Sequence, residues 1–275
     1  MPATPSRTLL AVRGLRKVFL LGSVLQKVEL EAVKGIDLTV APGESVGLVG
    51  ESGSGKTTTA RCILRLTEPS EGEILFEGTD VVALPQRHVR RLYRNMQMVF
   101  QDPNSSLNPR MRVREIVGEP LRLHLSMAKG EREERLSELM ELVGLSPMYL
   151  DRYPSQLSGG QRQRVGISRA IATHPMLVFL DEPTSSLDVS VRGQIMQLLR
   201  DLQRELGMAY VLISHDLGVV RQLCDRVLVM YNGRVVEQGT TRQIFEAPQD
   251  EYTKRLLAAI PSMDGYRRRR LTEVT

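Results

Sequence analysis

A glycine-rich motif near residue 50 constrains the fold of this 275-residue chain more than any other feature. It reads Gly50-Glu51-Ser52-Gly53-Ser54-Gly55-Lys56-Thr57 and fits the pattern G-x-x-x-x-G-K-[ST] of a phosphate-binding loop. Apolar residues predict a buried strand immediately before it, at 45–49, and a helix after Lys56. In that setting, backbone N–H groups from Gly53 to Thr58 converge on phosphate oxygens at the positive end of the helix. The motif therefore predicts an α/β core that binds a phosphorylated ligand.

Two side chains of the motif predict how a nucleotide and Mg²⁺ would be bound. Lys56 supplies a positive charge for the β and γ phosphates of a nucleotide, and the Thr57 hydroxyl is a suitable ligand for Mg²⁺. The glycines alone are also compatible with an ordinary turn. Such a turn needs neither the Lys-Thr pair nor the flanking strand and helix, so the motif favours a phosphate loop.

Apolar runs later in the chain predict a parallel sheet around this loop. The runs at 177–180 and 209–213 are typical of strands covered on both faces, with a helix expected between them from about Ser190. A hairpin is expected around Asn232-Gly233, which suits a type I′ turn. Thr240 and Gln243 have capping-box spacing, which predicts a short following helix.

Two regions differ from this core and suggest subdomains. Apolar stretches within residues 9–40, broken by Gly14, Gly22 and Gly35, predict a small antiparallel sheet. The middle of the chain is poor in strand-like runs and contains an amphipathic segment, 131–143, which predicts a helical insertion. The expected division is 1–101 for the N-terminal β subdomain and the first part of the core, 102–164 for the helical insertion, 165–240 for the second part of the core, and 241–275 for a C-terminal extension with a basic tail.

Two acidic residues, Asp181 and Glu182, follow the strand expected at 177–180. Adjacent carboxylates at the tip of a buried strand are costly unless a cation or a proton stabilises them. We therefore consider them candidate metal-binding and catalytic residues. An exposed acidic turn before Pro183 is the alternative for this pair taken alone.

A second glycine motif, Leu157-Ser158-Gly159-Gly160-Gln161, lies about a hundred residues after the first. It precedes a helix expected at 161–173, so a hydroxyl and several backbone N–H groups lie at a helix N-terminus, which is a second anion site. The chain has no second phosphate loop to face it, and its own loop lies across the helical insertion.

Composition and short motifs exclude several classes of protein. With 41% hydrophobic and 25% charged residues, the chain is neither disordered overall nor a membrane protein, and no apolar run reaches the roughly 18 residues of a membrane helix. We see no secretion signal and expect a cytoplasmic protein. Cys62 and Cys224 form no C-x-x-C pair, so reduced, buried thiols are expected. The run 267–270 is four arginines, which most simply form a solvated tail, with a weak contact to anionic lipid as the alternative.

The two glycine motifs in this order resemble the ATP-binding subunit of ABC transporters, over residues 9–261. The resemblance implies a P-loop NTPase (RecA-like) core with an N-terminal antiparallel β subdomain and an inserted α-helical subdomain. It also implies ATP, Mg²⁺ and a head-to-tail dimer. In such a dimer, residues of the phosphate loop (Gly50 to Thr58) hold ATP in one subunit, and Ser158, Gly159, Gly160 and Gln161 close over the ATP of the other.

The resemblance also assigns roles to single residues. Asp181 would orient the Mg²⁺ shell, and Glu182 would act as general base for the attacking water. Gln101 matches the Q-loop glutamine that touches Mg²⁺ and this water, and His215 matches the switch histidine that contacts the γ phosphate and positions Glu182. Taken alone, Gln101 is an ordinary polar loop residue and His215 an ordinary histidine at a strand end.

For two further residues that match the family, a purely structural role is a serious alternative. Asp188, in Ser186-Leu187-Asp188, resembles the D-loop that crosses the dimer interface, and it is also a candidate helix cap. Phe19 matches the aromatic residue that stacks on adenine in relatives, with a buried phenylalanine of the sheet as the alternative.

Within the family, residues 100–110 and 252–257 look like segments of the oligopeptide, dipeptide and nickel importer group. Gln249-Asp250-Glu251 stands where His-Pro is frequent, which is a departure. That group often pairs two ATPase subunits, one with a C-terminal cysteine cluster for an iron–sulfur centre. This chain has no cysteine after Cys224 and therefore resembles the other type.

The resemblance implies import of peptides or peptide-like solutes, with nickel, glutathione or another small solute as alternatives. The implied partners are two membrane permease subunits docked between the core and the helical insertion near 101–109, a second ATPase subunit, and, indirectly, an extracytoplasmic solute-binding protein. The chain would lie at the cytoplasmic face of the membrane and bind no nucleic acid. A soluble ABC ATPase acting on ribosomes or DNA is the rival, slightly favoured by the pI of 9.4. The fused units, long coiled coils and zinc modules of such proteins are not seen.

Overall fold

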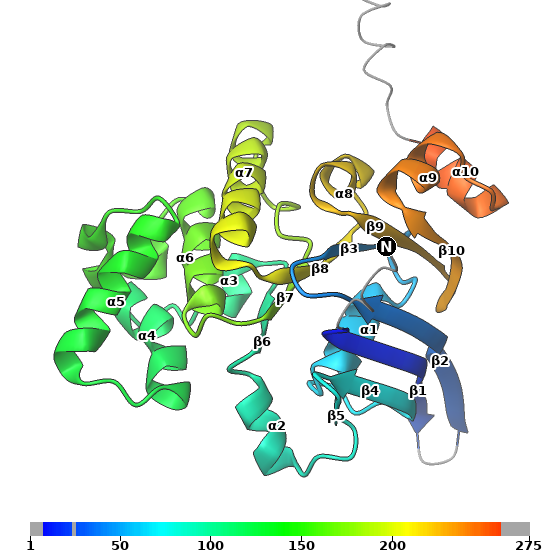
Figure 1. Cartoon of the computed structure of the whole chain (residues 1–275), viewed down its shortest axis with the longest axis horizontal. Helices are drawn as coiled ribbons and strands as arrows, with labels where there is room; N and C mark the ends of the chain where they lie inside the picture. Colours follow the sequence, from blue (N-terminus) through cyan, green and yellow to red (C-terminus); the bar gives the residue numbers. More distant parts are fainter. Residues whose placement is uncertain (1–7, 24–25, 260–275) are drawn as a thin grey trace, which may run out of the picture.

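Two β-sheets organise the chain, whose computed structural model describes residues 8–23 and 26–259 (Figure 1). The four-stranded antiparallel sheet has the order β2-β1-β4-β5. Its strands are β1 (Leu10–Ser23), β2 (Gln26–Val40), β4 (Glu71–Phe76) and β5 (Thr79–Asp80). The six-stranded sheet has the order β10-β9-β3-β8-β7-β6 and is parallel except for β10. Its strands are β3 (Ser45–Val49), β6 (Met96–Val99), β7 (Leu177–Asp181), β8 (Ala209–Ser214), β9 (Arg226–Tyr231) and β10 (Arg234–Thr240).

The helices lie mainly between and after the strands of the larger sheet. In chain order they are α1 (Lys56–Ile63), α2 (Gln86–Leu92), α3 (Pro103–Ser106), α4 (Val113–His124), α5 (Lys129–Leu142), the short 3₁₀ helices η1 (Pro147–Asp151) and η2 (Pro154–Gln156), α6 (Gly159–Ile171), α7 (Val189–Leu206), α8 (Leu217–Leu223), α9 (Thr241–Glu246) and α10 (Glu251–Ala258). No helix of the described ranges combines the length and the apolar character that a membrane span requires.

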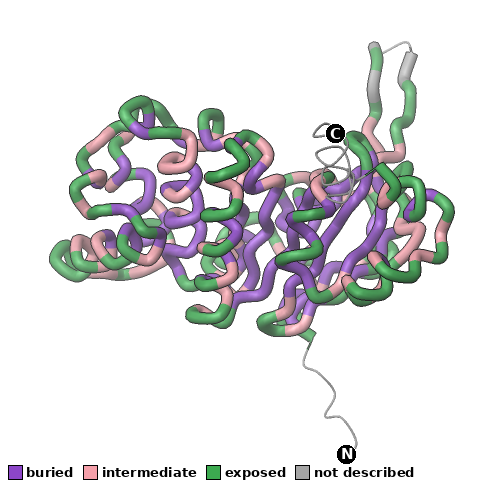
Figure 2. Tube along the Cα trace, turned by 90° about the horizontal axis from the view of Figure 1, so that it is seen from above, coloured by how far each residue is buried: buried purple, intermediate pink, exposed green. Residues whose placement is uncertain are grey.

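Two hydrophobic cores cover opposite faces of the six-stranded sheet. Successive side chains of a strand point to opposite faces. In β7, Phe179 packs into the core that contains α1 and the antiparallel sheet, whereas Val178 and Leu180 pack into the core that contains α6, α7 and the helical insertion. Figure 2 shows the resulting buried strands in the middle of the molecule. Helix α1 is thus enclosed between two sheets, while α6 lies on the other face.

The expected elements are largely confirmed. Buried strands 45–49, 177–180 and 209–213 are present in the parallel sheet, and the hairpin turn at Asn232 and Gly233 has positive φ at both residues, 46° and 80°. The capping box is formed: Thr240 accepts a hydrogen bond from the backbone of Gln243. Both cysteines are free and buried, and burial raises the pKa of the Cys62 thiol to about 11.

Three details differ from the sequence expectation. β1 continues through Gly14 and Gly22, and β2 through Gly35, so these glycines do not end strands; the register shifts near Gly14 are accommodated by its left-handed φ of 57°. Helix α6 begins at Gly159, two residues earlier than expected, because Ser158 caps it. The boundary placed after residue 164 therefore falls inside α6, and the arginine run 267–270 lies outside the described residues.

Candidate functional site

The phosphate loop joins β3 to α1, as its sequence predicts. Lys56 is 6% exposed, and its Nζ donates hydrogen bonds to the carbonyl oxygens of Gly50 (2.8 Å) and Glu51 (2.7 Å) and to Ser54 Oγ (3.2 Å). Gly50 has φ 147°, and a Cβ there would lie 2.1 Å from Met230 O. A Cβ on Gly55 would lie 2.4 Å from Ala32 O. Neither glycine can be replaced without moving backbone, so the spacing of the motif is a steric requirement of this loop.

Asp181 lies at the end of β7, which is separated from β3 in the sheet by β8, and its side chain reaches the loop. Thr57 Oγ1 donates a hydrogen bond of 3.0 Å to Asp181 Oδ1. Asp181 is 3% exposed, and burial raises the pKa of its carboxyl against the opposing effect of the Thr57 hydrogen bond. The expected pair of a hydroxyl and a carboxylate is therefore assembled at one point, with a cavity of about 460 Å³ beside it that is also lined by Gln101.

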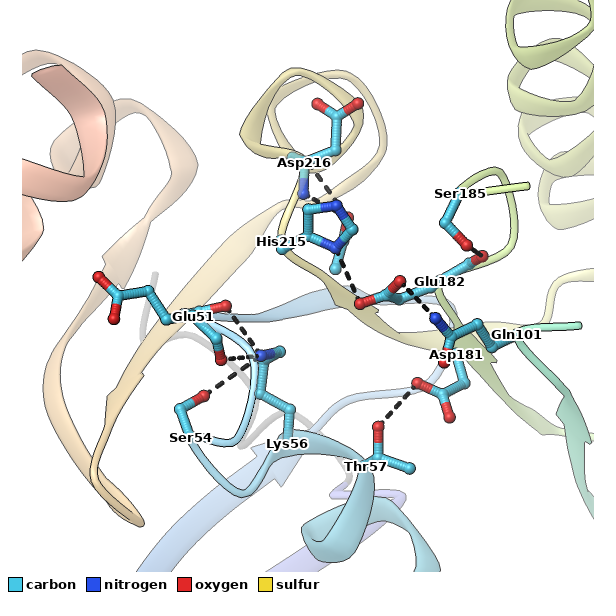
Figure 3. A network of polar contacts seen from close by, with 12 residues as sticks. Glu51, Ser54, Lys56, Thr57, Gln101, Asp181, Glu182, Ser185, His215 and Asp216 are labelled. Atoms are coloured by element: carbon cyan, nitrogen blue, oxygen red, sulfur yellow. Dashed lines mark hydrogen bonds and ion pairs between the residues drawn. The ribbon is translucent and has the colours of Figure 1, made fainter. Parts of the chain in front are cut away.

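Glu182 is held between two side chains from other segments (Figure 3). Gln101 Nε2 donates to Glu182 Oε2 at 2.9 Å, and His215 Nδ1 lies 2.8 Å from Glu182 Oε1. These contacts bring together the ends of β6, β7 and β8, which are adjacent in the sheet. Strand ends at the carboxyl edge of a parallel sheet are the usual place for a ligand site in such folds.

The backbone of Glu182 is in the left-handed region, with φ 45°. For a residue with a side chain this conformation costs about 1–2 kcal/mol. Turn hydrogen bonds oppose that cost: the Glu182 N–H donates to Ile213 O at 2.9 Å, and its carbonyl accepts from the Ser185 N–H and hydroxyl. In this conformation the Glu182 carboxylate contacts Gln101 and His215. Strained backbone of this kind is common at functional sites.

The second glycine motif is built as a helix N-terminus but lies apart from the loop. Ser158 caps α6 by accepting from Gln161 N, and Gln161 Oε1 accepts from Ser158 N in return. A Cβ on Gly160 would lie 2.7 Å from Val191 Cγ1, so this glycine allows α6 to pack on α7. Because α6 and α1 cover opposite faces of the sheet, the structure does not bring Ser158, Gly159, Gly160 and Gln161 to Lys56 of the same chain.

Asp188 and Phe19 lie at the surface or near it. Asp188 occupies the N-cap position of α7, as the helix-cap alternative expected, although its exposed side chain makes no capping hydrogen bond. Phe19 is partly buried in β1, with Lys17 Nζ 4.9 Å from the centroid of its ring. The alternative of a buried sheet phenylalanine is therefore wrong, because the ring is only partly buried and Lys17 lies over one of its faces.

Two contacts near the site were missed from the sequence. The Tyr252 hydroxyl accepts a hydrogen bond from Glu51 N at 3.0 Å. Arg169 of α6 donates to Ser106 O at 2.7 Å and lies over the Phe100 ring, beside Gln101. Both join segments far apart in sequence, and no local pattern signals them.

The donor set suits a nucleoside triphosphate with Mg²⁺. Within the described residues, no three His, Cys, Asp or Glu side chains cluster as a metal site. Mg²⁺ commonly takes only one or two carboxylates and completes its shell with water and substrate phosphates, and Asp181 with Thr57 offers hard oxygen ligands of this kind. Burial lowers the pKa of Lys56 and raises that of Asp181. A bound anion and a bound cation would each stabilise the charged form of one of these buried groups.

Comparisons with known proteins agree with this geometry. Residues 33–185 match the family described as ABC transporter. The chain is 49% identical over 237 residues to the oligopeptide transport ATP-binding protein OppF of Lactococcus lactis subsp. lactis, covering 86% of this chain and 74% of that protein. It is 49% identical over 265 residues to the glutathione import ATP-binding protein GsiA of Salmonella paratyphi A, covering 95% of this chain and 42% of that protein. A dimeric, post-hydrolysis structure of the ATP-binding cassette MJ0796 bound to ADP and Pi superposes with a TM-score of 0.76 at 32% identity, covering 85% of this chain and 99% of that one.

Proposed function

The chain belongs to the ABC transporter family, and on that premise we propose that it hydrolyses ATP to drive import of peptides or peptide-like solutes through a separate permease. The proposal that the chain hydrolyses ATP rests on the contacts that Gln101 and His215 make with Glu182, next to the buried Lys56. The name of the OppF relative supports the peptide part. The GsiA relative keeps glutathione as a second candidate solute.

In this proposal each side chain of the site has a distinct role. Glu182 polarises the water that attacks the γ phosphate and accepts its proton, while Gln101 and His215 hold the carboxylate in place. Lys56 would bind the β and γ phosphates, and Asp181 and Thr57 would hold Mg²⁺, which would supply positive charge as negative charge develops on the departing ADP. Phe19 is proposed to stack on the adenine ring.

A complete site requires a second subunit. The N-terminus of α6, with Ser158 to Gln161, belongs to a helix that covers the opposite face of the sheet from α1, which follows the chain's own loop. We therefore propose that this motif closes over ATP held by a partner ATPase, and that Asp188 lies at the shared interface. The dimeric state of MJ0796 supports this arrangement. The partner proposed from the resemblance is a different chain, of the type with an iron–sulfur centre.

The permease is proposed to dock in an apolar groove between the core and the helical insertion. Residues 101–109 were expected to lie at this surface, and Gln101 lines a polar cavity beside Thr57 and Asp181. A separate cavity of about 230 Å³ has a mostly apolar lining: Leu64, Leu66, Tyr93, Met96, Gln97, Met98, Phe100, Glu119, Pro120, Leu123, His124 and Arg169. Its rim exposes Leu66 (48%) and Leu123 (62%), which suits an amphipathic helix of a membrane partner at the cytoplasmic face.

Reconstitution tests the proposed function directly. The permease is reconstituted in vesicles with this chain, its partner ATPase and the solute-binding protein. We expect the vesicles to accumulate labelled oligopeptide only when MgATP is present on the side of the membrane where the chain lies. Removal of Mg²⁺ by a chelator should stop both hydrolysis and uptake. Recovery of nucleic acid, with no integral membrane protein, when the chain is isolated from cells would contradict the transport function and favour the soluble rival.

Leu123→Glu is expected to weaken binding of the chain to its permease by about tenfold to a hundredfold, because a carboxylate must then be desolvated in an apolar groove. Nucleotide affinity of the isolated chain should not change. Met148→Glu is the matched control, since Met148 is 67% exposed in η1 and does not line the groove. Equal permease binding by the two variants, measured by co-purification from detergent, would place the docking surface elsewhere.

A further inference from the structure

The C-terminal helix α10 contacts the phosphate loop directly. Tyr252, in its first turn, is 6% exposed, and its hydroxyl accepts a hydrogen bond of 3.0 Å from the N–H of Glu51. Glu51 is the residue that follows Gly50 at the start of the loop. Helix α10 thus reaches a loop that lies 201 residues earlier in the chain.

Glu51 is held from both sides of its backbone. Its N–H donates to Tyr252, and its carbonyl oxygen accepts from Lys56 Nζ at 2.7 Å. Together the two bonds restrict φ and ψ of Glu51, and so they fix the position of an acceptor that orients the Lys56 ammonium. A change at Tyr252 therefore reaches Lys56 through one intervening residue.

Tyr252 is itself rigidly placed. Its ring packs on Tyr231 with centroids 4.4 Å apart, and Asp250 caps α10 by accepting from the N–H of Tyr252. The Glu237 carboxylate anchors the start of the helix by accepting from the backbone N–H groups of Gln249 (2.8 Å) and Asp250 (3.1 Å). Burial raises the pKa of Tyr252, so its hydroxyl is a neutral acceptor at physiological pH.

We propose that Tyr252 is a positioning residue of the nucleotide site, which holds Glu51, and through it Lys56, in the arrangement that receives the phosphates. Helix α10 is then a functional part of the ATP site rather than an appendage. A contact that displaces α10 lowers the affinity for ATP. The inference rests on the proposed ATP site, and its test separates the two.

Tyr252→Phe removes the acceptor and keeps the ring on Tyr231. In the full-length chain, the Kd for MgATP measured by calorimetry is expected to rise by about twofold to tenfold, because ATP binding must then restore an arrangement of Glu51 and Lys56 that one internal hydrogen bond otherwise maintains. In the assembled transporter, KM for ATP should rise by the same factor while kcat stays within about twofold, because a misplaced loop weakens binding of the ground state and of the transition state equally. A purely structural role would not separate KM from kcat in this way.

Tyr231→Phe is the matched control, because it alters the other ring of the same stack without touching the loop. It is expected to bind MgATP like the wild type, with both variants unfolding at similar temperatures. Wild-type affinity in Tyr252→Phe, or an equal loss in both variants, would overturn the role of Tyr252. No binding of MgATP by the wild-type chain would instead contradict the proposed function.

Discussion

Replacing Glu182 with glutamine is expected to lower kcat for ATP hydrolysis by about 100-fold to 10,000-fold, the usual contribution of a general base. The two side chains that hold Glu182 can be satisfied by the amide. Its oxygen accepts from Gln101 Nε2, and its NH₂ group donates to His215 Nδ1 once the imidazole adopts the tautomer that accepts there. The left-handed backbone at residue 182 is also unaffected. The substitution therefore removes basicity and charge while the geometry remains.

Because Lys56 and the loop are untouched, MgATP affinity should remain within a few-fold of wild type, and the bound dimer should persist. Single-turnover hydrolysis measured by quench-flow separates the chemical step from binding and product release. Glu205→Gln, on the exposed end of α7, is the control for loss of one carboxylate. Hydrolysis by the Glu182 variant near the parent rate would exclude Glu182 as the base and direct attention to another acceptor near Gln101.

Features that depend on local backbone geometry were predictable from the sequence. Only glycine fits the positive-φ, crowded positions at Gly50 and Gly55, so the spacing of the glycines in the motif could be recognised in the sequence. Asn232 and Gly233 have the positive φ that their turn type requires. The positive φ of these residues is a local property of the backbone, which the sequence signals directly. The carbonyl groups that crowd Gly50 and Gly55 belong instead to Met230 and Ala32, in other segments of the chain.

Contacts between distant segments were predictable only where the family resemblance supplied them. Gln101 and His215 meet Glu182 across sequence separations of 81 and 33 residues, and their roles came from the resemblance, not from their spacing. The Tyr252 contact with Glu51 has no such precedent in the motifs and was missed. Glutamate gives no sequence signal for a left-handed backbone, so the strained conformation of Glu182 was also missed.

Surface exposure was the least predictable property. Apolar periodicity correctly places Leu136, Leu139 and Met140 of α5 in the helical core. The same apolar character does not reveal that Leu123, at the end of α4, remains exposed beside a groove. Burial depends on which neighbouring element covers a residue, and for Leu123 the proposed cover is another protein.

Lys56→Met is expected to lower kcat/KM for MgATP by about 1,000-fold or more. The ammonium makes charge-assisted hydrogen bonds to phosphates, each worth about 1.5–3 kcal/mol, so the Kd alone should rise by about tenfold to a hundredfold. Loss of a donor that stabilises the developing negative charge in the transition state lowers kcat by a further factor of about 100-fold. Nucleotide binding and steady-state hydrolysis together measure both parts. Lys129→Met, at the exposed start of α5, is the control for loss of one cation.

Folding stability distinguishes this effect from a general disruption of the loop. Burial lowers the pKa of Lys56, which means that the folded protein disfavours its ammonium relative to the unfolded chain. Methionine of similar length removes that cost, although it also removes the hydrogen bonds to Gly50 O and Glu51 O. The two effects oppose each other, so the nucleotide-free variant should unfold at a temperature close to that of the wild type while losing the stabilisation that MgATP confers. A large drop in the nucleotide-free unfolding temperature would instead mean that Lys56 mainly supports the loop, and that the lost activity reflects its collapse.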